Sequence, residues 1–159
     1  RDVAPSRGLG DVYKRQLVQG DAESAAYGRE AFDAATVAFG VRNFEDIPGG
    51  LTGLFSALRP GGKLFVLEFG MPRGRIFGTV YRFYFHRVLP RLGGWVSRDG
   101  KAYSYLPRSV DEFPYGEAFV RLLAETGFED CDCRNLFGGV AQIYTARRPD
   151  ACEKTEKRR

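Results

Sequence analysis

The stretch from Phe32 to Phe69 constrains the fold most, because it reads as strand, helix and strand. Ala34–Phe39 and Leu64–Leu67 are short apolar runs, which are typical of buried strands. Between them, apolar residues recur at helical spacing, at Ile47, Leu51, Leu54, Phe55 and Leu58. Two continuous apolar strands joined by one helix predict a parallel pair that is buried on both faces.

The ends of this predicted helix carry recognisable signals. Asp46 is a suitable N-cap, and Pro48 suits the first turn. Pro60-Gly61-Gly62 is expected to stop the helix before the second strand.

Polar residues follow both predicted strands at their carboxyl ends. Arg42 and Asn43 come after the first strand, and Glu68 closes the second. Ligands of parallel α/β sheets sit beyond these ends, so the three residues are candidates for a site. The alternative is structural: Arg42 pairs with a nearby carboxylate and Glu68 caps a helix. The pattern alone favours neither interpretation.

Two segments of this stretch resemble a known family. Phe32–Asn43 (FDAATVAFGVRN) and Leu58–Phe69 (LRPGGKLFVLEF) are similar to the ubiquinone/menaquinone biosynthesis C-methyltransferases, also called demethylmenaquinone methyltransferases. Gly20–Glu23, Tyr84–Arg91 and Tyr103–Leu106 agree with the same family. The resemblance covers about Leu17 to Arg147 and is more specific than a generic Rossmann-like pattern.

The resemblance implies the fold and the reaction. The fold would be an α/β, class I S-adenosylmethionine-dependent methyltransferase (Rossmann-like) sheet, truncated at its N-terminus. It would end in an antiparallel hairpin, which matches two predicted strands, Glu129–Phe137 and Val140–Ala146, across Gly138-Gly139. The reaction would be methylation of a ring carbon of a demethylated quinol that carries a prenyl tail.

The resemblance also assigns cofactor residues. Asp21 and Ala22 would contact the adenine of S-adenosylmethionine, although Asp21 also suits an ordinary turn. Ala38 stands where the family has a hydroxyl residue, which leaves only a backbone contact there. The family's glycine loop and its ribose-binding acid should precede Leu17 and are not found. We therefore expect a C-terminal fragment that is inactive alone.

Three residues are candidates for the chemistry. Arg42 would stabilise the phenolate that forms as the quinol loses a proton, and Asn43 would orient the ring or a water molecule. His86, the only histidine, or a bound water would accept the proton. The alternative for His86 is a packed, hydrogen-bonded histidine without a catalytic role.

The segment from Met71 to Arg98 differs in character from the rest. It carries six arginines, no acidic residue and many aromatic residues, and it predicts a helix that ends near Pro90 and Gly93-Gly94. Such a helix can lie in a membrane interface, cover an apolar substrate, or belong to the core with a basic outer face. Nucleic acid is a further interpretation, but no recognised motif supports it and the rest of the surface is not basic, so we expect no nucleic-acid partner.

Composition and charge set the domain limits. We expect a non-native or disordered leader over 1–16, a partial methyltransferase domain over 17–147 and a disordered charged tail over 148–159.

A helix is expected to start at Asp111 and Pro114 and to end at Gly127, with Tyr115 in its buried stripe. The three cysteines form neither a disulfide framework nor a metal site, and the protein is expected to be cytoplasmic or peripheral on the inner face of the membrane.

Two rival classes stay open at this point. One is another Rossmann-like enzyme, such as a nicotinamide-dependent reductase, which would need the glycine fingerprint that is not found here. The other is a non-enzymatic module that binds a membrane surface or a partner.

Overall fold

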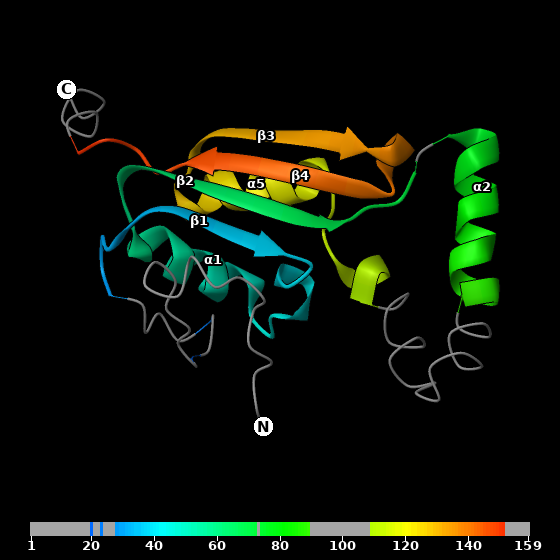
Figure 1. The fold of residues 1–159 in the computed structure, drawn as a ribbon, viewed down its shortest axis with the longest axis horizontal. Helices are drawn as coiled ribbons and strands as arrows, with labels where there is room; N and C mark the ends of the chain where they lie inside the picture. The colour runs from blue at the N-terminus through cyan, green and yellow to red at the C-terminus, as the bar shows by residue number, and fades with distance from the viewer. Residues whose placement is uncertain (1–19, 21–22, 24–27, 73, 90–108, 152–159) are drawn as a thin grey trace, which may run out of the picture.

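The computed structural model describes residues 20, 23, 28–72, 74–89 and 109–151. The longer elements are β1 (Phe32–Ala38), α1 (Ile47–Ala57), β2 (Leu58–Phe69), α2 (Arg75–Phe83), α5 (Glu117–Thr126), β3 (Glu129–Leu136) and β4 (Ala141–Arg147) (Figure 1). A 3₁₀ turn covers Val41–Asn43, a π-helical turn covers Tyr84–Val88, and a second 3₁₀ turn covers Phe137–Gly139. The expected leader, Asp21, Ala22, the 103–106 segment and the tail from Cys152 lie outside the described residues.

The described strands form one four-stranded sheet in the order β1-β2-β4-β3. β1 and β2 run parallel, with Ala35 opposite Leu64 and Ala38 opposite Leu67. β4 is antiparallel to both β2 and β3. The parallel strand–helix–strand unit and the C-terminal antiparallel hairpin are therefore confirmed, and the carboxyl ends of β1 and β2 meet at one edge.

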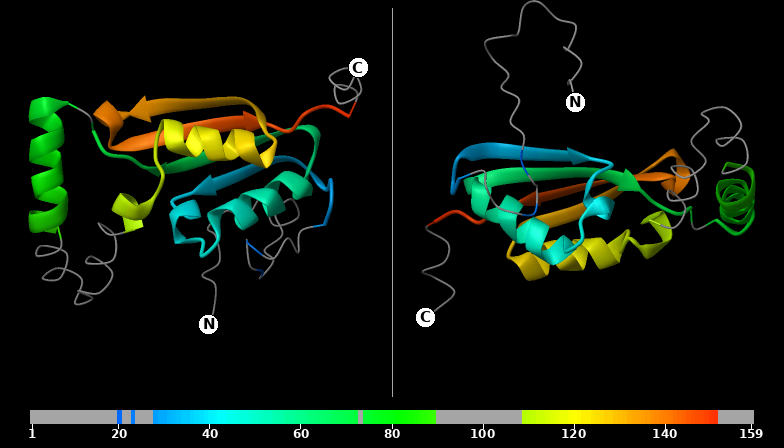
Figure 2. Two further views of the ribbon diagram at one scale, coloured as in Figure 1. Left: turned by 180° about the vertical axis from the view of Figure 1, so that it is seen from behind. Right: turned by 90° about the horizontal axis from the view of Figure 1, so that it is seen from below.

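One face of this sheet is covered by helices, and the other is open among the described residues. Figure 2 shows α1 and α5 side by side on the same face. On the opposite face, Phe65 is 38% exposed, and Ala34, Thr36 and Ala38 are exposed as well. The prediction that the parallel pair is buried on both faces is wrong for the described structure, because both long helices next to these strands pack on one side.

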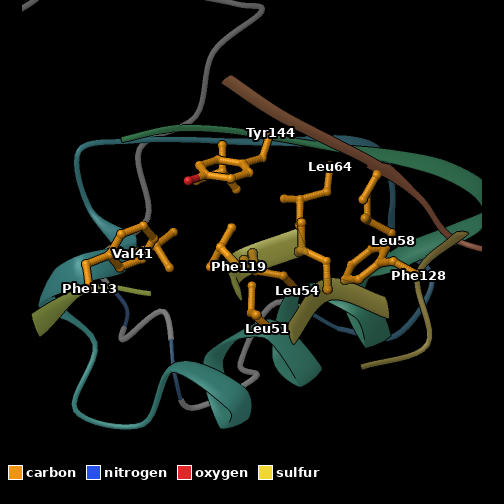
Figure 3. Packing of buried hydrophobic residues seen from close by; sticks show 12 residues of the cluster. Val41, Leu51, Leu54, Leu58, Leu64, Phe113, Phe119, Phe128 and Tyr144 are labelled. Carbon is orange, nitrogen blue, oxygen red and sulfur yellow. The ribbon is translucent and has the colours of Figure 1, made fainter. Parts of the chain in front are cut away.

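The main core fills the space between the sheet and these two helices. Alternate residues of the strands point into it, so that Leu64 and Tyr144 meet Leu51 of α1 and Phe119 of α5 (Figure 3). The Phe119 and Tyr144 rings lie 4.7 Å apart, edge to face. The buried members of this core are Val41, Leu51, Leu54, Leu58, Leu64, Val66, Phe113, Phe119, Leu123, Phe128, Tyr144 and Ala146.

The boundaries of α1 differ in two details from the sequence signals. Asp46 occupies the N-cap position, but its side chain makes no capping hydrogen bond. The helix ends at Ala57, before the Pro-Gly-Gly run, which belongs instead to β2. Gly61 adopts a left-handed φ of 77°, and its N–H donates to the carbonyl of Arg148 at 3.0 Å. The run thus shapes the start of the strand instead of stopping the helix.

The second long helix also begins later than expected. α5 starts at Glu117, and Asp111 lies in a separate short helical turn before it. Gly116 precedes the helix with φ 68° and ψ −133°, a backbone conformation that is accessible essentially to glycine alone. Tyr115 therefore lies before the helix and not in its stripe. Gly127 ends the helix in the left-handed conformation, as predicted.

The disordered charged tail was expected to begin at residue 148, but Arg148 is held against the rest of the fold. Arg148 is held by the carbonyls of Phe55, Ser56 and Leu58 at the end of α1, and by an ion pair with Glu30 at 2.7 Å. Its guanidinium also lies 4.9 Å from the centre of the Phe55 ring. Carbonyl groups at a helix C-terminus attract a cation, so this arginine ties the end of β4 to α1.

The helix expected between Met71 and Arg98 is confirmed over its described part. α2 and the π-helical turn stand across one end of the sheet, beyond the tip of the β3–β4 hairpin (Figure 1). In the part of the chain that the structure describes, no helix is both long enough and apolar enough to cross a bilayer.

Candidate active site

The carboxyl ends of β1 and β2 hold a buried ion pair between Arg42 and Glu68. Arg42 Nη1 lies 2.9 Å from Glu68 Oε2, and the two side chains are 12% and 0% exposed. The backbone N–H of Arg42 also donates to Glu68 Oε1 at 3.3 Å. The same carboxylate accepts the N–H of Phe69 at 3.3 Å. Glu68 therefore fixes Arg42 by both its backbone and its side chain.

The structural alternative for these residues is thus partly correct. Arg42 does pair with a nearby carboxylate, as that interpretation predicted, but Glu68 accepts from Arg42 and Phe69 instead of capping a helix. Burying a charged pair costs desolvation energy that the pair's own attraction often fails to repay. Such a pair at the ligand-binding edge of an α/β sheet is compatible with a functional role as well as a structural one.

The backbone of Phe39 holds the side chains of Arg42 and Asn43 at this edge. Its carbonyl accepts Arg42 Nη1 at 2.7 Å and Asn43 Nδ2 at 3.5 Å. Its φ is 54°, which is unusual for a bulky residue, and its N–H is held by the carbonyl of Leu67 at 2.8 Å. Strained backbone of this kind is concentrated at functional sites, and no residue pattern around Phe39 predicts it.

Aromatic rings flank the guanidinium. The rings of Phe39 and Phe69 lie 4.6 Å apart, and the guanidinium of Arg42 lies 5.2 Å from the centre of the Phe69 ring. Arg42 Nε is buried and has no hydrogen-bond partner among the described residues. An orphaned buried donor next to aromatic rings is a group that a water molecule or a ligand can satisfy.

A polar network lies next to Glu68 across the sheet. Gln142 is the register partner of both Glu68 and Asn135. Its Nε2 donates to Asn135 Oδ1 at 2.7 Å, and its Oε1 accepts the Tyr144 hydroxyl at 2.6 Å. The N–H of Gly116 donates to the Tyr144 hydroxyl at 2.7 Å. Burial raises the pKa of Tyr144 far above its usual range, so this hydroxyl stays protonated and supports the edge structurally.

His86 lies apart from Arg42 and Asn43 in the chain and in its contacts. It sits in the π-helical turn after α2, and its Nε2 is 3.5 Å from Asp111 Oδ2. Its ring meets Phe85 edge to face at 5.9 Å, and its side chain is 32% exposed. These contacts match the packed, paired histidine of the structural interpretation, and its catalytic role stays a prediction.

The predicted cofactor residues divide between described and undescribed parts. Ala38 ends β1 beside Leu67, on the open face and exposed. Asp21 and Ala22 lie outside the described residues, so their contact with a cofactor stays a prediction. Among the described residues, no group of three or more His, Cys, Asp or Glu side chains is arranged to hold a metal ion.

Hollows adjoin this edge where β2 leads into α2. One, of about 310 Å³, is lined by Met71, Pro72, Gly74, Gly78, Thr79, Arg82 and Tyr115. Another, of about 320 Å³, is lined by Met71, Gly74, Asn135, Gly138, Gly139 and Gln142. A hollow of about 400 Å³ on the open face, next to Lys63 and Arg147, lies at the opposite end of β2. The first two hollows lie just past the carboxyl end of β2, where ligands of such sheets bind. Arg42, Asn43 and Glu68 are not among the residues that line them.

Comparison with known proteins decides the family. Residues 7–148 match the model of the ubiE/COQ5 methyltransferase family. The chain belongs to this family. It is 46% identical over 126 residues to the ubiquinone/menaquinone biosynthesis C-methyltransferase UbiE of Geobacter sulfurreducens, covering 79% of this chain and 49% of that protein. It is 45% identical over 149 residues to the demethylmenaquinone methyltransferase of Thermus thermophilus, covering 94% of this chain and 66% of that protein.

Solved structures show the same fold at low sequence identity. An S-adenosylmethionine-dependent methyltransferase from Thermotoga maritima matches with a TM-score of 0.55 and 16% identity, over 82% of this chain and 63% of that one. Phosphoethanolamine N-methyltransferase 2 of Haemonchus contortus, solved with S-adenosylmethionine, matches with a TM-score of 0.56 and 14% identity, over 82% and 36%. The class I methyltransferase fold expected for this ubiE/COQ5 family member is confirmed.

Proposed function

We propose that a full-length protein containing this chain methylates a ring carbon of a demethylated, prenylated quinol, using S-adenosylmethionine, in menaquinone or ubiquinone biosynthesis. The observation that carries the proposal is the Arg42–Glu68 pair at the carboxyl ends of β1 and β2, in a chain of the ubiE/COQ5 family. The names of the Geobacter and Thermus relatives support the substrate class.

The proposed methyl transfer needs a positively charged group held in place to stabilise a phenolate. A ring carbon is a weak nucleophile until a neighbouring phenolic hydroxyl loses its proton, after which the phenolate directs electron density onto that carbon. Arg42 is fixed by Glu68 and by the Phe39 carbonyl, so its guanidinium is oriented before the phenolate forms. Preorganised donors of this kind stabilise developing charge without reorganising during the reaction.

The surrounding residues would hold the ring. The Phe39 and Phe69 rings offer flat apolar surface beside the guanidinium, and Asn43 would orient the ring or a water molecule. His86, or a water molecule held by these groups, would accept the phenolic proton. Glu68 acts through Arg42 as a positioning residue.

Bound S-adenosylmethionine would supply the electrophilic methyl group. The exposed carboxyl end of β1, at Ala38, is open to it among the described residues. By resemblance, Asp21 and Ala22 would contact its adenine. The glycine loop and ribose-binding acid of the family are not found before Leu17, so we propose that this chain alone binds S-adenosylmethionine too weakly to act. Isothermal titration of the chain with S-adenosylmethionine tests this, and micromolar affinity would contradict it.

The test of the main proposal is methyl transfer by the full-length protein. Radiolabelled methyl from S-adenosylmethionine should appear on a ring carbon when demethylmenaquinol or a demethylated benzoquinol is supplied. Label on an oxygen, or no transfer with either quinol, would contradict the proposal.

We also propose a peripheral contact with the inner face of the cytoplasmic membrane, through the segment 71–98. A quinol with a prenyl tail resides in the bilayer, so the enzyme must reach its surface. The six arginines and the aromatic residues of this segment support such a contact.

A further inference from the structure

Large apolar side chains are exposed at one end of the molecule. On α2 and the turn that follows it, Phe77 is 52% exposed, Val80 61%, Phe83 63% and Tyr84 43%. At the tip of the β3–β4 hairpin, Phe137 is 83% exposed. Burial of such side chains is favourable, so leaving several of them in water is costly unless another surface covers them.

The helical period places the exposed residues of α2 on one side. Phe77, Val80 and Tyr84 are spaced by three and four residues and share one stripe, with Phe83 beside it. Next to this stripe the helix turns toward the protein, where Phe85 is 3% exposed and stacks on Tyr81 at 5.5 Å. The helix is therefore apolar on its inner and its outer side.

The hairpin tip extends this outer side with a residue far away in the sequence. A Cβ placed on Gly138 would lie 3.1 Å from the ring of Phe77, so the tip and the start of α2 are in contact. Figure 1 shows that α2 stands at the end of the sheet where this hairpin turns. Phe137 adjoins this glycine and has a left-handed φ of 48°. We call Phe77, Val80, Phe83, Tyr84 and Phe137 the docking face.

The charge around the docking face suits an anionic surface. The segment 71–98 contains six arginines and no acidic residue, and Arg87 in the turn after α2 is exposed. Arg82 lines the hollow at Met71, on another side of α2. Basic residues near an anionic membrane are attracted to it, and salt screens this attraction. The described hollows next to α2 lie against Met71 and Gly74 and not on the docking face, which suits a broad surface better than a single prenyl tail.

We propose that the docking face seats on the surface of an anionic lipid bilayer, with Phe137 of the hairpin entering the interface together with the outer stripe of α2. This inference deepens the membrane contact proposed above by naming its residues. It adds a residue that the sequence pattern had placed in an ordinary hairpin.

The experiment is co-sedimentation of this chain with vesicles. One set contains phosphatidylcholine alone, and the other contains phosphatidylcholine mixed with phosphatidylglycerol. The chain should bind the anionic vesicles at low salt and release at high salt. Phe83→Ser and Phe137→Asn should each weaken binding about tenfold, because each removes the burial of one large apolar side chain. Asparagine is chosen at 137 because it tolerates left-handed backbone.

A matched control is Phe65→Ser, which removes an exposed aromatic residue from the open face of the sheet. It should leave vesicle binding unchanged. Three results would overturn the inference: no binding at low salt, equal loss in the control, or binding only when the vesicles contain a prenylated quinol. Methyl transfer by the full-length protein to a water-soluble quinol analogue is a separate readout, so failure of the docking face would leave the proposed reaction intact.

Discussion

Folded proteins usually bury apolar side chains and expose charged ones. The carboxyl edge of the sheet departs from this by burying charges, and the docking face departs from it by exposing apolar side chains. At the edge, the charges of Arg42 and Glu68 are almost fully buried. At the docking face, large apolar side chains lie in solvent, with Phe137 83% exposed. Folded proteins rarely do either without a reason. The two regions are joined by the short connection from β2 to α2, so both exceptions are concentrated at one end of the molecule.

Under the proposed function, the two regions have different tasks toward the same quinol substrate. A buried ion pair gives a rigid, oriented cation, which is what a developing phenolate needs. An exposed apolar surface gives weak and reversible contact with a bilayer. We therefore expect substitutions at the edge to change stability and chemistry, and substitutions on the docking face to change only where the protein resides.

The largest expected effect is on stability at the edge. Arg42→Ala leaves the Glu68 carboxylate buried without its charged partner, which should cost about 3–5 kcal/mol of unfolding free energy. Urea unfolding of this chain measures the change. Adding Glu68→Gln to the Arg42→Ala variant should recover part of the loss, because it removes the uncompensated charge. A single variant as stable as the original chain would show that the pair is not buried as described.

A smaller effect is expected in the network next to the pair. Tyr144→Phe removes the hydroxyl that donates to Gln142 and accepts from Gly116. The Gly116 N–H keeps Gln142 Oε1 at 3.1 Å, so the expected loss is about 1 kcal/mol. Tyr84→Phe is the matched control, because Tyr84 is 43% exposed, and it should change thermal stability less. Equal shifts in the two melting curves would argue against a buried network.

The smallest effect on stability is expected on the docking face. Phe137→Asn should change the unfolding free energy by no more than about 0.5 kcal/mol, as is usual for an exposed position. The same variant should lose vesicle binding. If Phe137→Asn instead unfolds the hairpin, as judged by circular dichroism, the side chain has a structural role and the contrast between the two regions fails.

The parallel unit was predictable because its signals are local. The apolar runs of β1 and β2, the helical spacing of α1 and the Gly138-Gly139 turn each follow from a few neighbouring residues. Arg42 and Glu68 were recognised as polar groups at strand ends, and parallel pairing then brought them together. The resemblance of Phe32–Asn43 and Leu58–Phe69 led to the proposed reaction, which no spacing alone would have indicated.

The missed features depend on contacts between distant residues. Nothing in the sequence shows that Arg148 reaches back to the carbonyls of Phe55 and Leu58, so the tail was expected to start too early. The left-handed backbone of Phe39 and the contact between Gly138 and Phe77 are likewise products of tertiary packing. The start of α5 was misplaced because Asp111 and Pro114 are common helix signals, whereas Gly116 is the residue that precedes the helix.

The most direct test of the account compares methyl transfer by the full-length protein with and without Arg42→Lys. The guanidinium uses Nη1 alone to reach both Glu68 and the Phe39 carbonyl, so its other nitrogens remain to meet a phenolate. Lysine keeps the positive charge but has only one nitrogen for all of these contacts. The account predicts that transfer to the quinol ring falls on the order of 100-fold while the melting temperature changes little. Transfer at the original rate by a folded Arg42→Lys variant would contradict the role of this edge in the reaction.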